Sequence, residues 1–475
     1  MRIPCLILNL TLILSLSGCC GSMTADRSNL ALPRLERALD AKHAEVAGKG
    51  LLYAGASMKD ITTDFARKDG VYLGGFDPGR RSVAVRDPVF AHVLYLDDGR
   101  EPLVIVTLDV IGILNDDVRD IRALASERFQ DRIVVASTHD HVGPDLIGFW
   151  GPAMFGVVPM CSGRLPDFQE TVKALVAEAI DEAARSARPA RLRAAVGLAD
   201  PTLSLNIHPQ IRAQKDDSVR VLAVEDTDGR PIAVLANWGC HAESMWDDDQ
   251  LSADWPGVFY REWTAAGGGV PLFAQGAVGG LVSVNPGDDR MKLEPEIMDV
   301  FLKHVSVPER LVLRDRIGKS FAGTVRDAVK GAARTFGPEG VTLSVRSKRF
   351  ELLEDNWIFE YMGTRRLIQR KVEYRNGTPW LTTEVLAARV RAGTDVVADL
   401  VTFPGEPAPP LVAEIDSLSA AQARFNLALG SDEIGYVVRE ADWDHPEYEY
   451  ERTMSLGRTT GTEILKVIRD LREGL

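Results

Sequence analysis

Two histidines separated by one residue, His139 and His141, follow the short apolar run of residues 132–136. This run has the length and β-branched content of a buried strand. In extended backbone, successive side chains alternate, which would put both imidazoles on one side and Asp140 on the other. Two imidazoles at a strand end are an incomplete zinc site, since zinc normally takes three or four protein ligands. An isolated His-x-His is equally often a hydrogen-bonded pair of loop histidines.

Further polar residues follow other expected strands, each next to glycine. His241 comes after the strand 231–238, Ser283 after 272–275 and Glu406 after 396–403. Strand ends that open into one crevice are a usual way to assemble a site from distant segments. Two histidines and a carboxylate are the ligands of many hydrolytic zinc sites. Taken alone, Glu406 could instead favour a helix N-terminus electrostatically.

The elements that must position these residues alternate between strands and helices. Expected hairpins lie at 89–110 and 219–238, and expected helices include 117–129, 166–186, 254–265 and 461–473. Asp254 is expected to be an N-cap. The pattern predicts an α/β to α+β class, with mixed sheets flanked by helices in one large domain from residue 50 to 475. Residues 142–165 are expected to be a long irregular loop of the kind that is often functional.

Composition restricts the class of protein. The chain has 475 residues, is 45% apolar and carries a formal net charge of −13, which argues against a nucleic-acid partner. Of the five cysteines, Cys5 is expected to be removed with a signal segment and Cys19 to be lipidated, and the three that remain do not make a disulfide framework. Cys240, beside His241, is expected to be a buried free thiol instead of a ligand.

The N-terminus has the features of a secretory signal over residues 1–18. Residues Leu16-Ser-Gly-Cys19 resemble a bacterial lipobox, which implies cleavage before Cys19 and lipidation of its thiol. Residues 19–49 would then be a tether with a helix over 33–46. This predicts an extracytoplasmic protein held to a bacterial membrane by lipid; a plain cleaved signal is the alternative.

The ordered set of motifs resembles the neutral/alkaline ceramidases over roughly residues 50–460. The stretches that carry the resemblance are 54–62, 80–88, Thr138-His-Asp-His-Val-Gly-Pro144, Gly239-Cys-His241 with Ser244-Met245, Ser252-Ala-Asp254, Phe273-Ala-Gln275 and Phe403-Pro-Gly-Glu406. The Thr-His-x-His-x-Gly-Pro motif is fairly specific, and the ordered set is much more so.

The resemblance implies a zinc amidase. Its zinc ligands would be His139, His241 and Glu406, with a tyrosine near the C-terminus as the fourth. Tyr436 is the best match, and Tyr448 and Tyr450 are competitors for the role. His141 would lie beside the zinc and stabilise the oxyanion or shuttle a proton. Asp109 would either orient a ligand histidine or act as a capping residue, and we favour the cap.

Three departures from the family pattern affect the expected activity. The family usually has an acidic or amide residue and Ser-Pro-Asn after the Phe-Ala-Gln strand, whereas this chain has Gly279-Gly-Leu-Val-Ser-Val-Asn285. Ser283 is therefore a candidate catalytic or substrate-contacting residue whose nucleophilic role is in doubt. The family's His-Pro-Thr-Ser is here His241-Ala-Glu-Ser244. No C-terminal immunoglobulin-like module is expected.

The resemblance therefore predicts a zinc hydrolase of an amide bond in an N-acylated, possibly ceramide-like lipid. The expected partners are a lipid or small-molecule substrate and the membrane, through lipid on Cys19. One alternative is a zinc hydrolase of an ester or another linear amide. A second is a surface lipoprotein that keeps the scaffold as a binding module without catalysis.

Overall fold

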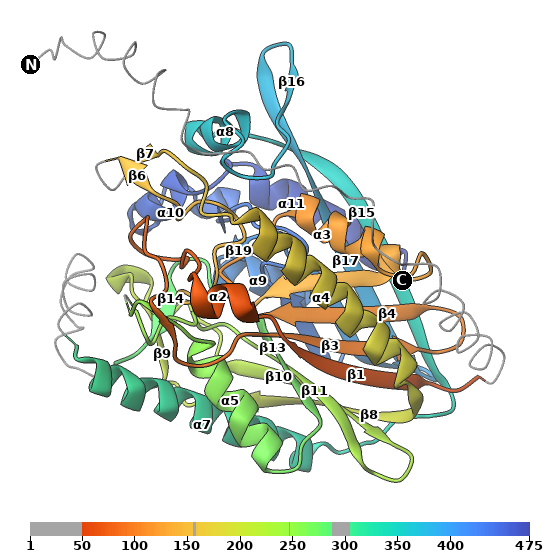
Figure 1. Ribbon diagram of the computed structural model, residues 1–475. Helices are drawn as coiled ribbons and strands as arrows, with labels where there is room; N and C mark the ends of the chain where they lie inside the picture. The colour runs from red at the N-terminus through yellow and green to blue at the C-terminus, as the bar shows by residue number, and fades with distance from the viewer. Residues whose placement is uncertain (1–49, 155–157, 247, 287–304) are drawn as a thin grey trace, which may run out of the picture.

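Two β-sheets stacked face to face, with helices on both outer sides, make up the described part of the chain (Figure 1). The structure is a computed structural model that describes residues 50–154, 158–246, 248–286 and 305–475. The expected signal segment, the tether and the helix over 33–46 lie outside these residues.

The larger sheet contains eight strands. In spatial order they are β13 (Val270–Gln275), β11 (Pro231–Trp238), β10 (Ser218–Asp226), β8 (Arg188–Leu198), β1 (Tyr53–Asp60), β3 (Phe90–Asp97), β4 (Pro102–Leu108) and β5 (Ile133–Ser137). The pairs β11/β13 and β4/β5 are parallel, and the other pairs are antiparallel. Both expected hairpins are confirmed, as β3/β4 and β10/β11.

The smaller sheet contains β15 (Val341–Leu353), β17 (Thr378–Ala392), β18 (Asp395–Thr402) and β20 (Ala423–Leu427), with β16 (Glu373–Arg375) paired to β17. The segment after Glu406 forms helix α9 (Pro409–Ser417) and then β20, which pairs in parallel with β18. Five residues of strand are too few for their pattern to be recognised without the partner strand.

Strand β3 illustrates why the layers form. Its alternate residues Val93 and Tyr95 pack beneath helix α4 (Pro166–Arg185), whereas Leu94 and Leu96 face the smaller sheet. Because both faces of the strand are buried, its sequence is almost continuously apolar.

The remaining helices cover the rest of the two sheets. Helices α5 (Asp254–Ala265) and α7 (Val307–Gly331) lie side by side over the half of the larger sheet that contains β10 and β11 (Figure 1). Helix α11 (Thr460–Glu473), with α9, covers the smaller sheet. The expected mixed α/β class in a single domain is confirmed. The other elements are α2 (Thr63–Lys68), β2 (Ala84–Val85), α3 (Asn115–Leu124), β6 (Ala153–Met154), β7 (Val158–Pro159), β9 (Ser204–Asn206), β12 (Gln250–Leu251), β14 (Val282–Val284), α8 (Trp357–Thr364), β19 (Glu406–Pro407), β21 (Tyr436–Val437) and α10 (Glu449–Thr453).

The start of helix α5 differs from the expectation. Asp254 was predicted to be its N-cap, but it is the first helical residue, with φ of +47°, and Ala253 precedes it as the cap. Its carboxylate turns back to accept hydrogen bonds from the backbone N–H of Met245 (2.8 Å) and the hydroxyl of Ser244. Asp254 therefore fixes the loop that follows His241.

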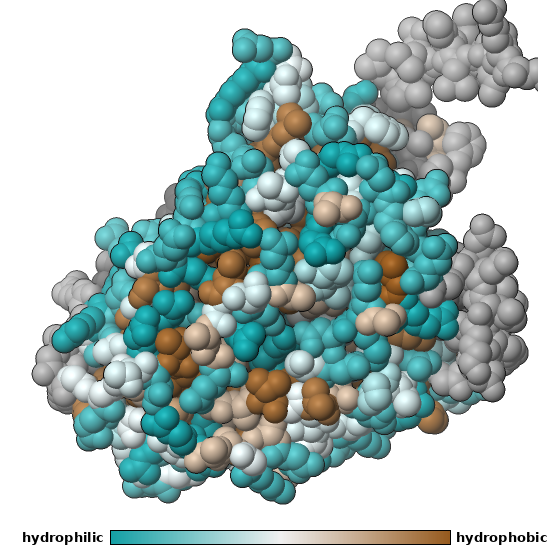
Figure 2. Space-filling view, turned by 180° about the vertical axis from the view of Figure 1, so that it is seen from behind, coloured by the Kyte–Doolittle hydropathy of each residue, from teal (hydrophilic) through white to brown (hydrophobic). Residues whose placement is uncertain are grey.

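One face of the described part is mostly polar. Figure 2 shows small, separate hydrophobic areas scattered over a largely hydrophilic face. Within the described ranges, no helix is both long enough and apolar enough to cross a membrane.

Asp432, a buried carboxylate in the C-terminal part of the chain, forms hydrogen bonds to three segments that are distant in the sequence. It accepts hydrogen bonds from Arg370 (2.6 and 3.2 Å), from the hydroxyl of Thr383 (2.7 Å) and from the backbone N–H of Asn115 (3.0 Å). Its side chain is fully buried, so each of these donors replaces water. The loop that leads to Tyr436 is held by this residue.

We expect Asp432→Ala to lower the free energy of unfolding by about 3–5 kcal/mol, because it leaves the buried guanidinium of Arg370 without a counter-charge. Asp228→Ala is the matched control. The Asp228 side chain is 67% exposed, and an exposed ion pair such as the one it forms with Arg230 contributes about 1 kcal/mol or less to stability. Urea denaturation followed by circular dichroism measures both. Equal effects of the two substitutions would contradict the role given to Asp432.

Candidate metal centre

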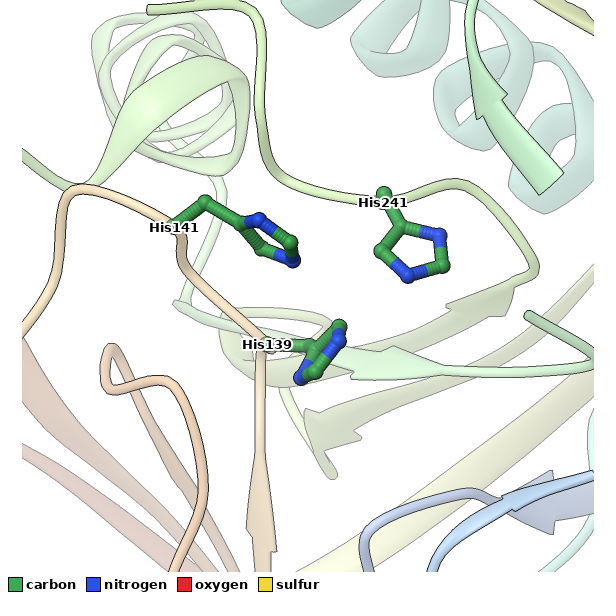
Figure 3. A group of neighbouring side chains, drawn as sticks. All are labelled: His139, His141 and His241. Carbon is green, nitrogen blue, oxygen red and sulfur yellow. The ribbon is translucent and has the colours of Figure 1, made fainter. Parts of the chain in front are cut away.

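The ends of strands from both sheets meet at one point. His139 and His141 follow β5, His241 follows β11, and Glu406 begins β19 shortly after β18. The three imidazole centroids lie 4.8–5.3 Å apart, and the rings point toward one another (Figure 3). The structure thus brings together the histidines and the carboxylate that the sequence analysis selected.

The backbone at His139 is not extended, as the sequence analysis assumed. Strand β5 ends at Ser137, and His139 has a φ of +58°, in the left-handed region that non-glycine residues seldom adopt. Simple alternation therefore does not explain why His139 and His141 face the same centre. The two imidazoles do face one centre, as expected, but strand alternation is not the cause. His139, the residue with the strained backbone, lies at the candidate site.

Backbone carbonyls fix two of the imidazoles. The Nδ1 atom of His139 lies 2.8 Å from the carbonyl oxygen of Ile111, and Nδ1 of His241 lies 2.9 Å from that of Val282. Each Nδ1 therefore carries the hydrogen when the ring is neutral, and each Nε2 is left as an acceptor. Both Nε2 atoms face one oxygen of Glu406, Oε2, at 3.3 and 3.2 Å. A carbonyl behind each imidazole is the arrangement usual for metal-ligating histidines.

Glu406 and His241 each stabilise the charged form of the other. Burial alone would raise the pKa of Glu406, but His139 and His241 outweigh burial and lower it to about 2. Burial alone would lower the pKa of His241, but Glu406 and neighbouring carboxylates raise it to about 9. In the metal-free protein, Glu406 is thus ionised and forms an ion pair with the protonated ring of His241.

The polar atoms at the centre fit a divalent cation. Among the described residues, Nε2 of His241 and Oε2 of Glu406 are buried without a hydrogen-bond partner. Nitrogen and carboxylate oxygen are ligands that zinc accepts readily. His139, His141 and His241 also form the one group of three metal-ligating side chains found close together in the described ranges.

Tyr436 lies next to Glu406 in the fold. The two are register partners in the parallel pair β19/β21, so their side chains share one side of the pair, and Tyr436 is buried. The competing tyrosines are placed differently. The hydroxyl of Tyr448 donates to Gln214 (2.9 Å), and Tyr450 is 52% exposed. Tyr436 remains the predicted fourth ligand.

His141 differs from the other two histidines. Neither of its ring nitrogens has a hydrogen-bond partner in the described part of the chain. Burial, together with the positive charges of His139, His241 and Arg80, lowers its pKa well below the ordinary value, so the ring is neutral. It packs closely against Gly75 and Phe76: a Cβ at Gly75 would lie 2.4 Å from Nδ1 of His141, so only glycine fits there.

The sequence analysis assigned no role to Glu243, which reaches this site. It is buried, its Oε1 accepts a hydrogen bond from the hydroxyl of Ser283, and its Oε2 lies 3.7 Å from Nδ1 of His141. The sequence feature that could have indicated this residue was Glu243 itself, which stands where the resembled motif has threonine, two residues after His241. Ser283 thus contacts Glu243; in the described chain its other hydroxyl partner is the carbonyl of Val284.

Two other sequence expectations concern residues around the centre. Asp109 does not contact the clustered histidines; it accepts from the backbone N–H of Phe90 (2.9 Å) and the hydroxyl of Tyr260 (2.8 Å). It holds the start of β3 and the ring of Tyr260, and it caps none of the helices in the described ranges. Cys240 is fully buried and is a free thiol, as expected.

We expect zinc binding to release about one proton per ion at pH 7.5, because a ligand imidazole must be neutral and His241 is protonated below pH 9 in the metal-free protein. Affinity should accordingly weaken as the pH falls. Calorimetric titration in buffers of different ionisation enthalpy measures the protons. Glu406→Gln, which removes the charge that holds this proton, should bind more weakly and release fewer. Equal proton release in both proteins would contradict the pairing.

Comparisons with known proteins identify the fold. Neither a model of a known protein family nor a curated protein sequence matches the chain. Among solved structures, it is similar to neutral ceramidase from Pseudomonas aeruginosa, with a TM-score of 0.69 and 16% identity over 90% of this chain and 75% of that one. A ceramidase complexed with C2 gives a TM-score of 0.68 and 16% identity over 89% and 75%. The chain therefore has the fold of neutral ceramidase, as the resemblance in its motifs predicted.

Proposed function

We propose that this protein is a zinc-dependent hydrolase that cleaves the amide bond of an N-acylated, lipid-like molecule. One observation carries the proposal: Nε2 of His139 and of His241 converge on a single oxygen of Glu406, at 3.3 and 3.2 Å, although the three residues come from separate segments. Two imidazoles and a carboxylate that leave a position open are typical of hydrolytic zinc sites.

In this proposal, His139, His241, Glu406 and Tyr436 would hold the zinc. His141 is close enough to compete, since its ring lies 4.8 Å from that of His139, between centroids. We assign it a different role, because no backbone carbonyl of the described residues fixes either of its nitrogens, in contrast to His139 and His241. When bound, zinc would supply a Lewis acid that polarises the amide carbonyl and makes water more acidic.

The protein's own residues would perform the remaining chemistry. His141 is neutral and buried, so it can accept the proton of the attacking water and donate it to the leaving nitrogen. The carbon–nitrogen bond then breaks as the carbon–oxygen bond forms, and the products are a carboxylic acid and an amine.

An apolar cluster beside the site favours a lipid-like substrate. Phe76 packs against both His141 and Trp246, with ring centroids 4.9 and 4.2 Å apart. Trp246 in turn packs with Leu205, and Ile207 and Val305 border them. Such a surface is suited to an acyl chain. The fold shared with neutral ceramidase supports the same substrate class.

Hydrolysis assays with zinc-loaded protein test this function. We expect fluorogenic N-acyl amides, including a ceramide analogue, to be cleaved, and His139→Ala to lower kcat/KM by about 10³-fold or more with loss of zinc, because several kcal/mol of transition-state stabilisation disappear. His445→Ala, a histidine outside the cluster, is the matched control and should retain both zinc and activity. Acyl chains of increasing length would define the apolar subsite.

Two outcomes would lead to other assignments. Cleavage of matched esters without cleavage of any amide would make the protein a zinc esterase. Stoichiometric zinc with no hydrolysis of either class would make it a binding protein on a hydrolase scaffold.

We also propose that the protein is lipid-anchored outside the cytoplasm, on the basis of Leu16-Ser-Gly-Cys19 at the end of an apolar segment. Expressed in a bacterium with its own N-terminus, the protein should partition with membranes, and Cys19→Ser should move it out of the lipid-modified membrane fraction. Cys20→Ser is the matched control and should remain membrane-bound. Incorporation of a labelled fatty acid in the Cys19→Ser variant would contradict the proposal.

A further inference from the structure

Glu243 is a buried carboxylate at the centre that the proposed zinc ligand set does not require. Glu243 is 6% exposed, and it lies in the loop directly after His241. Its two oxygens face different groups: Oε1 accepts the hydroxyl of Ser283, and Oε2 lies 3.7 Å from Nδ1 of His141.

Its contact with Ser283 bears on what Ser283 can do. A nucleophilic serine needs a base that takes its proton, usually an imidazole. In the described part of the chain, the partners of the Ser283 hydroxyl are Glu243 and the carbonyl of Val284, and neither is an imidazole. The proton of Ser283 is instead used to orient the carboxylate of Glu243.

Its Oε2 lies 3.7 Å from Nδ1 of His141, which is longer than a hydrogen bond but places a carboxylate on that side of the ring. The other two histidines have Nδ1 fixed by carbonyl oxygens, whereas both nitrogens of His141 are buried without a hydrogen-bond partner among the described residues. Gly75 and Phe76 confine the ring. Because Nδ1 is on the side of Glu243, the other nitrogen, Nε2, is on the side of the ring that points toward His139 and His241 (Figure 3).

We infer that Glu243 is a positioning residue: held by Ser283, its carboxylate keeps the hydrogen of His141 on Nδ1 and leaves Nε2 as the proton acceptor at the centre. This inference rests on the proposed function and deepens it, because it states which atom of His141 accepts the proton of the attacking water. A carboxylate behind an imidazole sets the tautomer of that imidazole in the same way in other hydrolytic sites.

Substitutions at Glu243 separate positioning from simple packing. Glu243→Gln keeps the size of the side chain and its acceptor for Ser283, but it presents an amide N–H₂ to Nδ1 of His141 and so favours the wrong tautomer. We expect kcat to fall about 10²- to 10⁴-fold, with KM and zinc content unchanged. Glu243→Asp keeps the carboxylate and should retain more activity than Glu243→Gln, although it is the poorer match in size.

Other orders of activity would overturn the inference. If Glu243 only filled space, the isosteric glutamine variant would be the more active of the two. Ser283→Ala should cost less activity than Glu243→Gln, since it removes only the group that orients the carboxylate. A larger loss in Ser283→Ala would show that Ser283 itself reacts with the substrate.

The tautomer can be measured without any activity. The chain has eight histidines, so ¹⁵N-histidine labelling gives a small set of ring signals, and His141→Gln assigns the one of interest. In metal-free wild-type protein we expect His141 to carry its hydrogen on Nδ1, and in Glu243→Gln on Nε2. A wild-type ring with hydrogen on Nε2 would overturn the inference. This readout remains valid if the protein hydrolyses none of the substrates tested, an outcome that would count against the proposed function alone.

Discussion

The contact of one carboxylate oxygen of Glu406 with two imidazoles is the interaction on which the centre depends. A buried carboxylate without a partner would lose several kcal/mol of hydration, so it must either be neutralised or meet positive charge. His241 provides that charge in the metal-free protein, and the combined effect of His139 and His241 on the pKa of Glu406 exceeds that of burial. Glu433, a nearby buried carboxylate, shows the opposite result: burial and the charge of Glu406 raise its pKa well above the ordinary value.

The arrangement of the sheets makes this contact possible. The histidines come from strand ends of the larger sheet, and Glu406 follows a strand of the smaller one. Short ladders join these ends: Glu406 pairs with Tyr436 in β19/β21, and the backbone N–H of His141 donates to the carbonyl of Ala242 at 2.9 Å. Backbone geometry therefore restricts the positions of the side chains before any ion binds, as an effective catalytic site requires.

At 16% identity, the fold shared with neutral ceramidase depends on few common residues. The stacked sheets require only that buried positions be apolar and of suitable volume, so most core residues can differ. The fold alone does not determine the surroundings of His141, where the carboxylate of Glu243 accepts a hydrogen bond from the hydroxyl of Ser283.

The sequence by itself determined the fold class and most strand and helix positions, because apolar periodicity is a local property. The choice of His139, His241 and Glu406 as a ligand set came from the ordered motifs that resemble the neutral/alkaline ceramidases. Strand β20 was missed, because its five residues become a strand only when β18 is beside them. The left-handed backbone of His139, the turn of Asp254 toward Met245 and the contacts of Glu243 were also beyond the sequence. Each of these depends on partners far away in the chain, and only the packed sheets bring those partners within hydrogen-bonding distance.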